Sequence, residues 1–167
     1  MKLALSVLPL IILSVVYFAL PEPSTSAANK GAGTIFTNNT PIDILSSTTS
    51  AAPFVATTYP STIAVSGMTG NITKIEVTVD GITHSNLGNL DMLLVSPTGR
   101  KYVFLSDSGG AASVEDRIYT FSDDAAAPIT VSSSQSGTYR PSSGDSFVDA
   151  FPAPAPTPPY SQPPTDT

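Results

Sequence analysis

The chain has 167 residues and a formal net charge of −6, from 13 acidic and 7 basic side chains. This length suffices for one domain, and the acidic balance argues against nucleic acid and anionic membrane surfaces as partners. The sequence contains no cysteine, so its core must be stable without disulfides. Charged residues make up only 12%, while Ser, Thr, Gly, Pro and Ala are plentiful, which favours an extracellular β-sandwich with many turns.

Residues 1–28 have the layout of a secretory signal peptide. Lys2 precedes an apolar stretch over residues 3–20, and a polar segment with small residues then ends at Ala28. We expect cleavage after Ala27 or Ala28 and a secreted, extracellular product without membrane contact. An uncleaved signal anchor is the alternative, because the apolar stretch approaches the roughly 20 residues that a spanning helix needs.

Residues 29–33 are predicted to be a flexible lead-in, followed by a β-rich domain over residues 34–151. Short strands are predicted at residues 34–36, 42–45, 62–65, 118–121 and 129–132, with a Ser/Thr-rich loop at 46–58 and a turn-rich segment at 137–146. The remaining residues, 152–167, contain seven prolines. Because proline cannot donate to a sheet ladder, we expect this tail to be polyproline II or disordered.

The clearest strand pattern lies between Asn71 and Ser106. Ile75, Val77 and Val79 alternate with polar residues, which predicts that these three side chains share one buried face. Residues 90–95 are almost continuously apolar, as is typical of a strand buried on both sides. A Ser-Pro-Thr-Gly turn at residues 96–99 then leads into an aromatic and β-branched strand at 102–105.

A series of short motifs runs through the domain in a fixed order. They are Val65-Ser66-Gly67, Gly70-Asn71-Ile72, Gly81 with His84, Asn89-Leu90-Asp91, the turn at 94–99, Ser106-Asp107-Ser108-Gly109-Gly110, and residues 121–126. In these motifs and their order, the chain resembles the P domain, or Homo B domain, that follows the catalytic domain of subtilisin-like proprotein convertases. Residues 137–141 and 151–156 are similar to the version found in secreted bacterial proteins, and the resemblance extends from about Thr34 to about Pro156.

The resemblance implies an all-β, jelly-roll β-sandwich similar to galactose-binding-like modules. It implies a secreted, non-catalytic accessory module that supports subtilisin-like serine endopeptidases, and so takes part in proteolysis by domain association. The family continues with an Asn-Gly-x-Trp turn and two final strands, whereas this chain has no tryptophan. The sandwich is therefore expected to be incomplete at its C-terminus. Two alternatives stay open: a free-standing cell-surface or glycan-binding adhesion module, and a truncated fragment without independent function.

We expect no peptidase activity from this chain. A subtilisin-type site needs a nucleophilic serine, a histidine base and an orienting aspartate. His84 is the only histidine, it lies at the end of a predicted strand, and no Gly-x-Ser-x-Gly motif is present. We therefore interpret His84 as a structural or surface residue and assign no catalytic residue.

Calcium is the candidate cofactor, although none is implied with certainty. Aspartates lie at predicted strand ends or in loops, at positions 80, 91, 107, 123 and 124. Loops at one end of a sandwich would bring Asp107 together with Asp123 and Asp124, which makes these three the candidate ligands, since calcium prefers six to eight oxygens. No EF-hand pattern is present, and turn formation is the alternative role of these aspartates.

A glycan site would use aromatic side chains as platforms. Tyr102, Tyr119, Tyr139 and Phe151 are the candidates. Aromatic residues on strands are more commonly part of the core, which is the competing interpretation.

Overall fold

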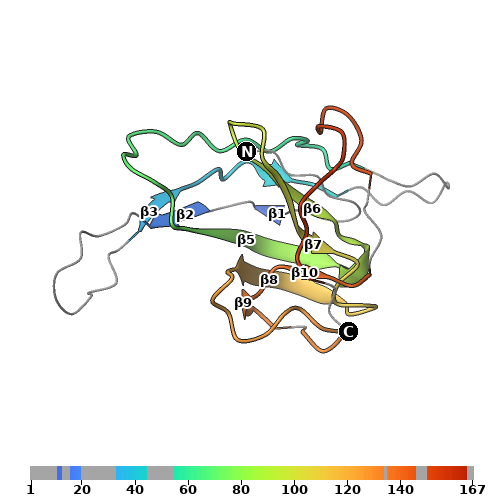
Figure 1. The fold of residues 1–167 in the computed structure, drawn as a ribbon. Helices are drawn as coiled ribbons and strands as arrows, with labels where there is room; N and C mark the ends of the chain where they lie inside the picture. Colours follow the sequence, from blue (N-terminus) through green and yellow to red (C-terminus); the bar gives the residue numbers. More distant parts are fainter. Residues whose placement is uncertain are drawn as a thin grey trace.

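The structure is a computed structural model that describes residues 11–12, 16–19, 33–44, 55–133, 135–145 and 150–164. Within these ranges the chain forms ten β-strands in two sheets and one 3-10 turn, η1 (Leu87–Asn89) (Figure 1). The predicted all-β class is confirmed, whereas the jelly-roll topology stays a prediction. Among the described residues, no helix has the length and apolar character that crossing a membrane would require.

The larger sheet is built around the long strand β5 (Lys74–His84), which runs through the centre of Figure 1. Strand β8 (Val114–Phe121) pairs antiparallel with one edge of β5, and β2 (Val16–Ala19) and β1 (Ile11–Ile12) pair with the other. The sheet is extended by β3 (Thr34–Phe36) beside β2, β4 (Pro41–Ile42) beside β1, and β9 (Gly137–Tyr139) parallel to β8. The central strand therefore pairs with segments that are distant from it in the sequence.

The smaller sheet contains β6 (Met92–Val95), β7 (Lys101–Ser106) and β10 (Ser142–Ser143). Strand β7 pairs antiparallel with β6 and parallel with β10. The predicted turn joins β6 to β7: the Gly99 N–H donates to the Ser96 carbonyl over 3.0 Å, and the Ser96 N–H donates to the Arg100 carbonyl over 2.9 Å. Gly99 has a φ of 84°, a left-handed conformation that glycine adopts without steric cost.

The two sheets share one hydrophobic core. Its members come from both sheets and from the connecting loops, and the largest fully buried side chains include Tyr119, Ile82, Leu87, Met92 and Leu105. Burial follows the alternation along β5 at Val77 and Val79. The pairing of β5 with β8 then shifts its register between Val79 and Ile82, and Ile82, of the opposite parity, is also buried in this core. The predicted inward face of the central strand is thus confirmed at Val77 and Val79.

Two predicted strands are wrong. Residues 62–65 and 129–132 are irregular, although Ile63 and Ile129 are buried in the core. The Ile129 N–H is satisfied by the Ser142 hydroxyl at 2.9 Å, so this segment inserts its side chain without joining a ladder. Conversely, the segment predicted to be only turn-rich contributes the short strands β9 and β10.

The proline-rich tail packs against the smaller sheet over its described residues. The Ser161 N–H donates to the Lys101 carbonyl over 3.0 Å, and the Val103 N–H donates to the Ser161 carbonyl over 2.8 Å. Tyr160 is buried in a second cluster with Leu93, Val95 and Val103, and its ring meets that of Phe151 edge to face. The sequence predicted polyproline II or disorder for this tail. Instead, its non-proline residues hold the described part of the tail against the smaller sheet.

The predicted signal peptide lies outside the described residues except for β1 and β2. Its cleavage, and the signal-anchor alternative, stay predictions.

Candidate functional site

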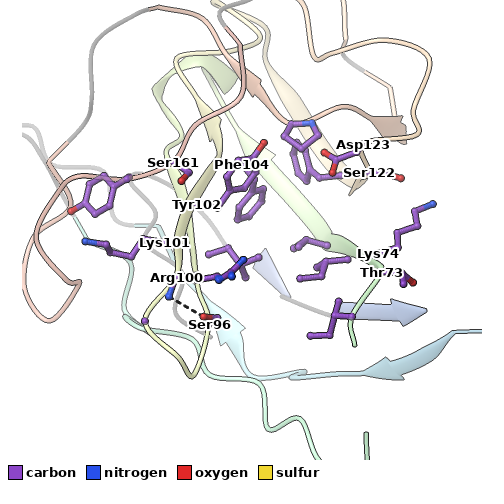
Figure 2. Close-up of a pocket in the computed structure, with 18 of the residues that line it drawn as sticks. Thr73, Lys74, Ser96, Arg100, Lys101, Tyr102, Phe104, Ser122, Asp123 and Ser161 are labelled. Atoms are coloured by element: carbon purple, nitrogen blue, oxygen red, sulfur yellow. Dashed lines mark hydrogen bonds between the residues drawn. The ribbon is translucent and has the colours of Figure 1, made fainter. Parts of the chain in front are cut away.

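A groove of about 810 Å³ opens between the two sheets, at the end where β5 begins, β8 ends and the β6–β7 turn lies (Figure 2). Phe104 and Phe121 line it from β7 and β8, and both rings are otherwise buried in the core. Ile75, Leu94 and Tyr102 add further apolar surface from both sheets. The groove is therefore a part of the inter-sheet space that solvent can enter.

Ile75 shows why this region is open. It has the same parity along β5 as Val77 and Val79, so all three side chains point between the sheets. Val77 is 4% exposed and Val79 is fully buried, but Ile75 is 38% exposed. The neighbouring Ile72, which also lines the groove, is 54% exposed. The apolar face of β5 thus continues beyond the part of the core that covers it.

Three of the seven basic side chains of the chain lie around this groove, namely Lys74, Arg100 and Lys101. The ammonium groups of the two lysines both have polar partners. The Lys74 Nζ lies 2.7 Å from a carboxylate oxygen of Asp124 and 2.7 Å from one of Glu76. Hydrogen bonds to Asp124 first, and to Glu76 second, raise the pKa of Lys74.

The Lys101 Nζ donates to the Thr157 carbonyl over 2.6 Å and lies 5.6 Å from the centre of the Tyr160 ring. Arg100 differs from both lysines. Its backbone N–H donates to the Ser96 hydroxyl, but its guanidinium, unlike the two ammonium groups, has neither a hydrogen bond nor an ion pair with any described residue. Figure 2 shows this side chain extending from the turn into the groove.

Asp123 is the acidic side chain that lines the groove, and it is exposed after the end of β8. Burial, together with the negative charge of Asp123, raises the pKa of the Tyr102 hydroxyl. The negative charge of Asp123 therefore acts on the Tyr102 hydroxyl across the groove. Within the described ranges, no ion pair involves Asp123.

The predicted calcium ligands occupy two different settings. Asp124 is ion-paired with Lys74. Asp107 follows β7 with a φ of 49°, and the Ser106 hydroxyl lies 3.5 Å from its carboxylate and 3.2 Å from that of Asp91. In the part of the chain that the structure describes, no group of three or more His, Cys, Asp or Glu side chains is suited to hold a metal. Calcium binding stays a prediction.

His84 is buried at the end of β5, with 3% exposure. Its Nδ1 contacts both the Asn86 N–H, at 3.0 Å, and the Asn86 carbonyl, and its Nε2 has no hydrogen-bond partner among the described residues. Burial lowers the pKa of His84, which favours the neutral imidazole. This environment supports the interpretation of His84 as a structural residue.

The four aromatic residues that were candidates for a glycan site lie in different environments. Tyr119 is fully buried, its hydroxyl donates to the Ser133 carbonyl over 2.9 Å, and Tyr139 packs on its ring edge to face. Phe151 packs on Tyr160. Tyr102 alone of the four lines the groove.

Sequence reasoning missed Arg100 and Tyr160 as groove residues. The signal for Arg100 was present, since a basic pair directly follows the Ser-Pro-Thr-Gly turn. No local signal placed Tyr160 there, because its position depends on the tail folding back onto β7.

The described chain is thus an all-β module whose two sheets share a core and leave an apolar groove with a basic rim. Residues 72–140 match the family model of the proprotein convertase P-domain, a non-catalytic accessory domain. The match spans less than half of the chain, but it contains β5 to β9 and most of the groove, and it confirms the resemblance over these residues. No curated protein and no solved structure matches the chain.

Proposed function

We propose that the chain is a secreted accessory module that packs against a subtilisin-like serine endopeptidase domain through the groove. The P-domain match over residues 72–140 supports an accessory role beside such proteases. The observation that carries the proposal is that most of the residues lining the groove lie inside the matched segment. A surface used for docking is expected to expose apolar side chains together.

The energetic argument concerns the uncovered face of β5. Ile72 and Ile75 are both substantially exposed beside the partly buried Leu94 and Tyr102. Each Å² of apolar surface that a partner covers contributes about 25 cal/mol before the entropic cost of association is subtracted. A partner that inserts apolar side chains would extend the existing core instead of forming a separate contact.

The experiment is capture of a purified subtilisin-like protease domain by the immobilised full-length chain. We expect the wild type to retain the protease domain and Ile75→Lys to lose it. Val131→Lys is the matched control, because Val131 is 75% exposed and does not line the groove. Equal capture by wild type and Ile75→Lys, or no capture by wild type, would contradict the proposal.

Glycan binding is the second candidate function. It is favoured by Tyr102, which presents an aromatic ring to the groove near the carboxylate of Asp123. Retention on a carbohydrate array that disappears in Tyr102→Ala, with the fold preserved, would support this role over protease docking.

A further inference from the structure

We propose that the groove binds an extended peptide segment that carries apolar side chains and one acidic side chain, whose carboxylate pairs with Arg100. The inference rests on the proposed function in one respect, that a partner protein supplies the segment. It adds the chemistry of that segment and the residue that selects it.

The Arg100 guanidinium has no counter-charge among the described residues. The chain as a whole is acidic, with a net charge of −6, yet the groove is lined by three cations and one carboxylate. Lys74 pairs with Glu76 and Asp124, and Lys101 donates to the Thr157 carbonyl, whereas the Arg100 guanidinium meets no described acceptor. A planar guanidinium binds a carboxylate through two parallel hydrogen bonds, and it tolerates apolar surroundings better than an ammonium group.

This cation lies at a groove with an apolar floor. Phe104 and Phe121 lie at the base of the groove, and Ile75 and Leu94 flank it from opposite sheets. Ligand sites of roughly 300–1,000 Å³ commonly combine apolar walls with a few polar groups that fix orientation. The groove, at about 810 Å³, has room for several side chains of a bound segment.

The openness of the groove favours a peptide over an anionic lipid. An acyl chain is apolar along its whole length, and in this groove, where Ile72 and Ile75 remain open to solvent, part of its surface would stay in water. In an extended peptide, alternate side chains face opposite directions. Such a segment can direct apolar side chains and a carboxylate into the groove while its other side chains stay in water.

The probe is a fluorescein-labelled, C-terminally amidated nonapeptide, Val-Thr-Val-Thr-Asp-Thr-Val-Thr-Val, which places four valines and the aspartate on one face. Its matched control has asparagine at the centre. Both are titrated with the full-length chain, and binding is measured by fluorescence anisotropy. We expect the aspartate peptide to bind wild type about tenfold more tightly than the asparagine peptide, a difference typical of a hydrogen-bonded ion pair.

Variants then test whether the Arg100 side chain causes the preference for the aspartate peptide. Arg100→Gln should bind the two peptides equally, and Arg100→Glu should prefer a peptide with lysine at the centre. Arg117→Gln removes the same charge outside the groove, and it should keep the tenfold preference. Since Arg100 is exposed and its guanidinium has no described partner, thermal melts of Arg100→Gln should match wild type.

The inference is overturned if wild type binds both peptides equally or binds neither, or if Arg100→Gln keeps the preference. Its failure is separable from that of the proposed function. If the chain captures the protease domain but binds the two peptides equally, only the proposal of an acidic segment is refuted. Peptide discrimination without capture of a protease domain would refute only the protease as the partner.

Discussion

The rings of Phe104 on β7 and Phe121 on β8 meet edge to face, with centroids 5.1 Å apart and an interplanar angle of 68°. These strands belong to different sheets, so the pair joins the two sheets directly at the base of the groove. Such pairs contribute about 0.5–1.5 kcal/mol beyond the burial of their area.

Truncation of this pair should be costly. We expect Phe104→Ala to lower the free energy of unfolding by about 3–5 kcal/mol, because it removes buried surface and leaves a cavity. Phe104→Leu should cost less, since leucine refills most of the volume. Urea denaturation measures both values, and a loss below about 1 kcal/mol in Phe104→Ala would show that the sheets do not share this contact.

A matched pair of substitutions on β5 tests which part of its apolar face is covered. Val77→Asp should abolish the cooperative melt, because it buries an unpaired charge in the core. Ile75→Asp, on the same face but open to the groove, should keep a cooperative transition. Circular dichroism melts distinguish the two, and a native-like melt of Val77→Asp would mean that the strand register is wrong.

The packing of the tail predicts a stabilising role for Tyr160. Tyr160→Ala should lower the free energy of unfolding by about 3–5 kcal/mol, the usual cost of truncating a buried aromatic residue. Tyr160→Phe should cost only about 1 kcal/mol, from loss of the hydrogen bond to the Pro156 carbonyl. If Tyr160→Ala melts like wild type, the tail contributes nothing to the fold.

Gly144 is tightly confined beside Asp107. A Cβ added to Gly144 would lie 2.0 Å from the Asp107 carbonyl oxygen, and the Gly144 N–H donates to the Ser106 carbonyl over 2.8 Å. Gly144→Ala should therefore displace β10 from β7 and lower the melting temperature. Gly99→Ala, which meets only the strain of a left-handed φ, should cost about 1–2 kcal/mol. A harmless Gly144→Ala would show that this contact is relaxed in solution.

His84 makes stability depend on pH. Because burial lowers its pKa in the folded state, the unfolded chain binds a proton more readily. The contribution of neutral His84 is complete above the ordinary pKa near 6.5, and it decreases as pH falls through that value.

We expect the free energy of unfolding to decline below pH 6.5, and to decline less in His84→Gln. This is the only histidine in the chain, so the difference between the two pH profiles isolates it. Identical profiles from pH 7.5 to 5 would contradict the buried, neutral imidazole.

The sequence by itself determined the local features of this domain. Alternation along residues 74–79 identified the inward face of β5, and the Ser-Pro-Thr-Gly pattern identified the turn between β6 and β7. The order of short motifs identified the P-domain resemblance, which the match over residues 72–140 confirms. These features depend on side-chain periodicity and backbone preference, which adjacent residues encode.

Only the tertiary structure decided which faces are covered. Ile75 and Val77 have the same pattern in the sequence, but one is open to the groove and the other is buried, because coverage depends on where distant segments pack. The same reason explains Ile63 and Ile129, which are buried without being in strands, and Tyr160, which is anchored by the edge of β7. The groove exists because distant segments do not pack over the start of β5. The alternation of apolar residues continues there, so it does not show where the packing stops.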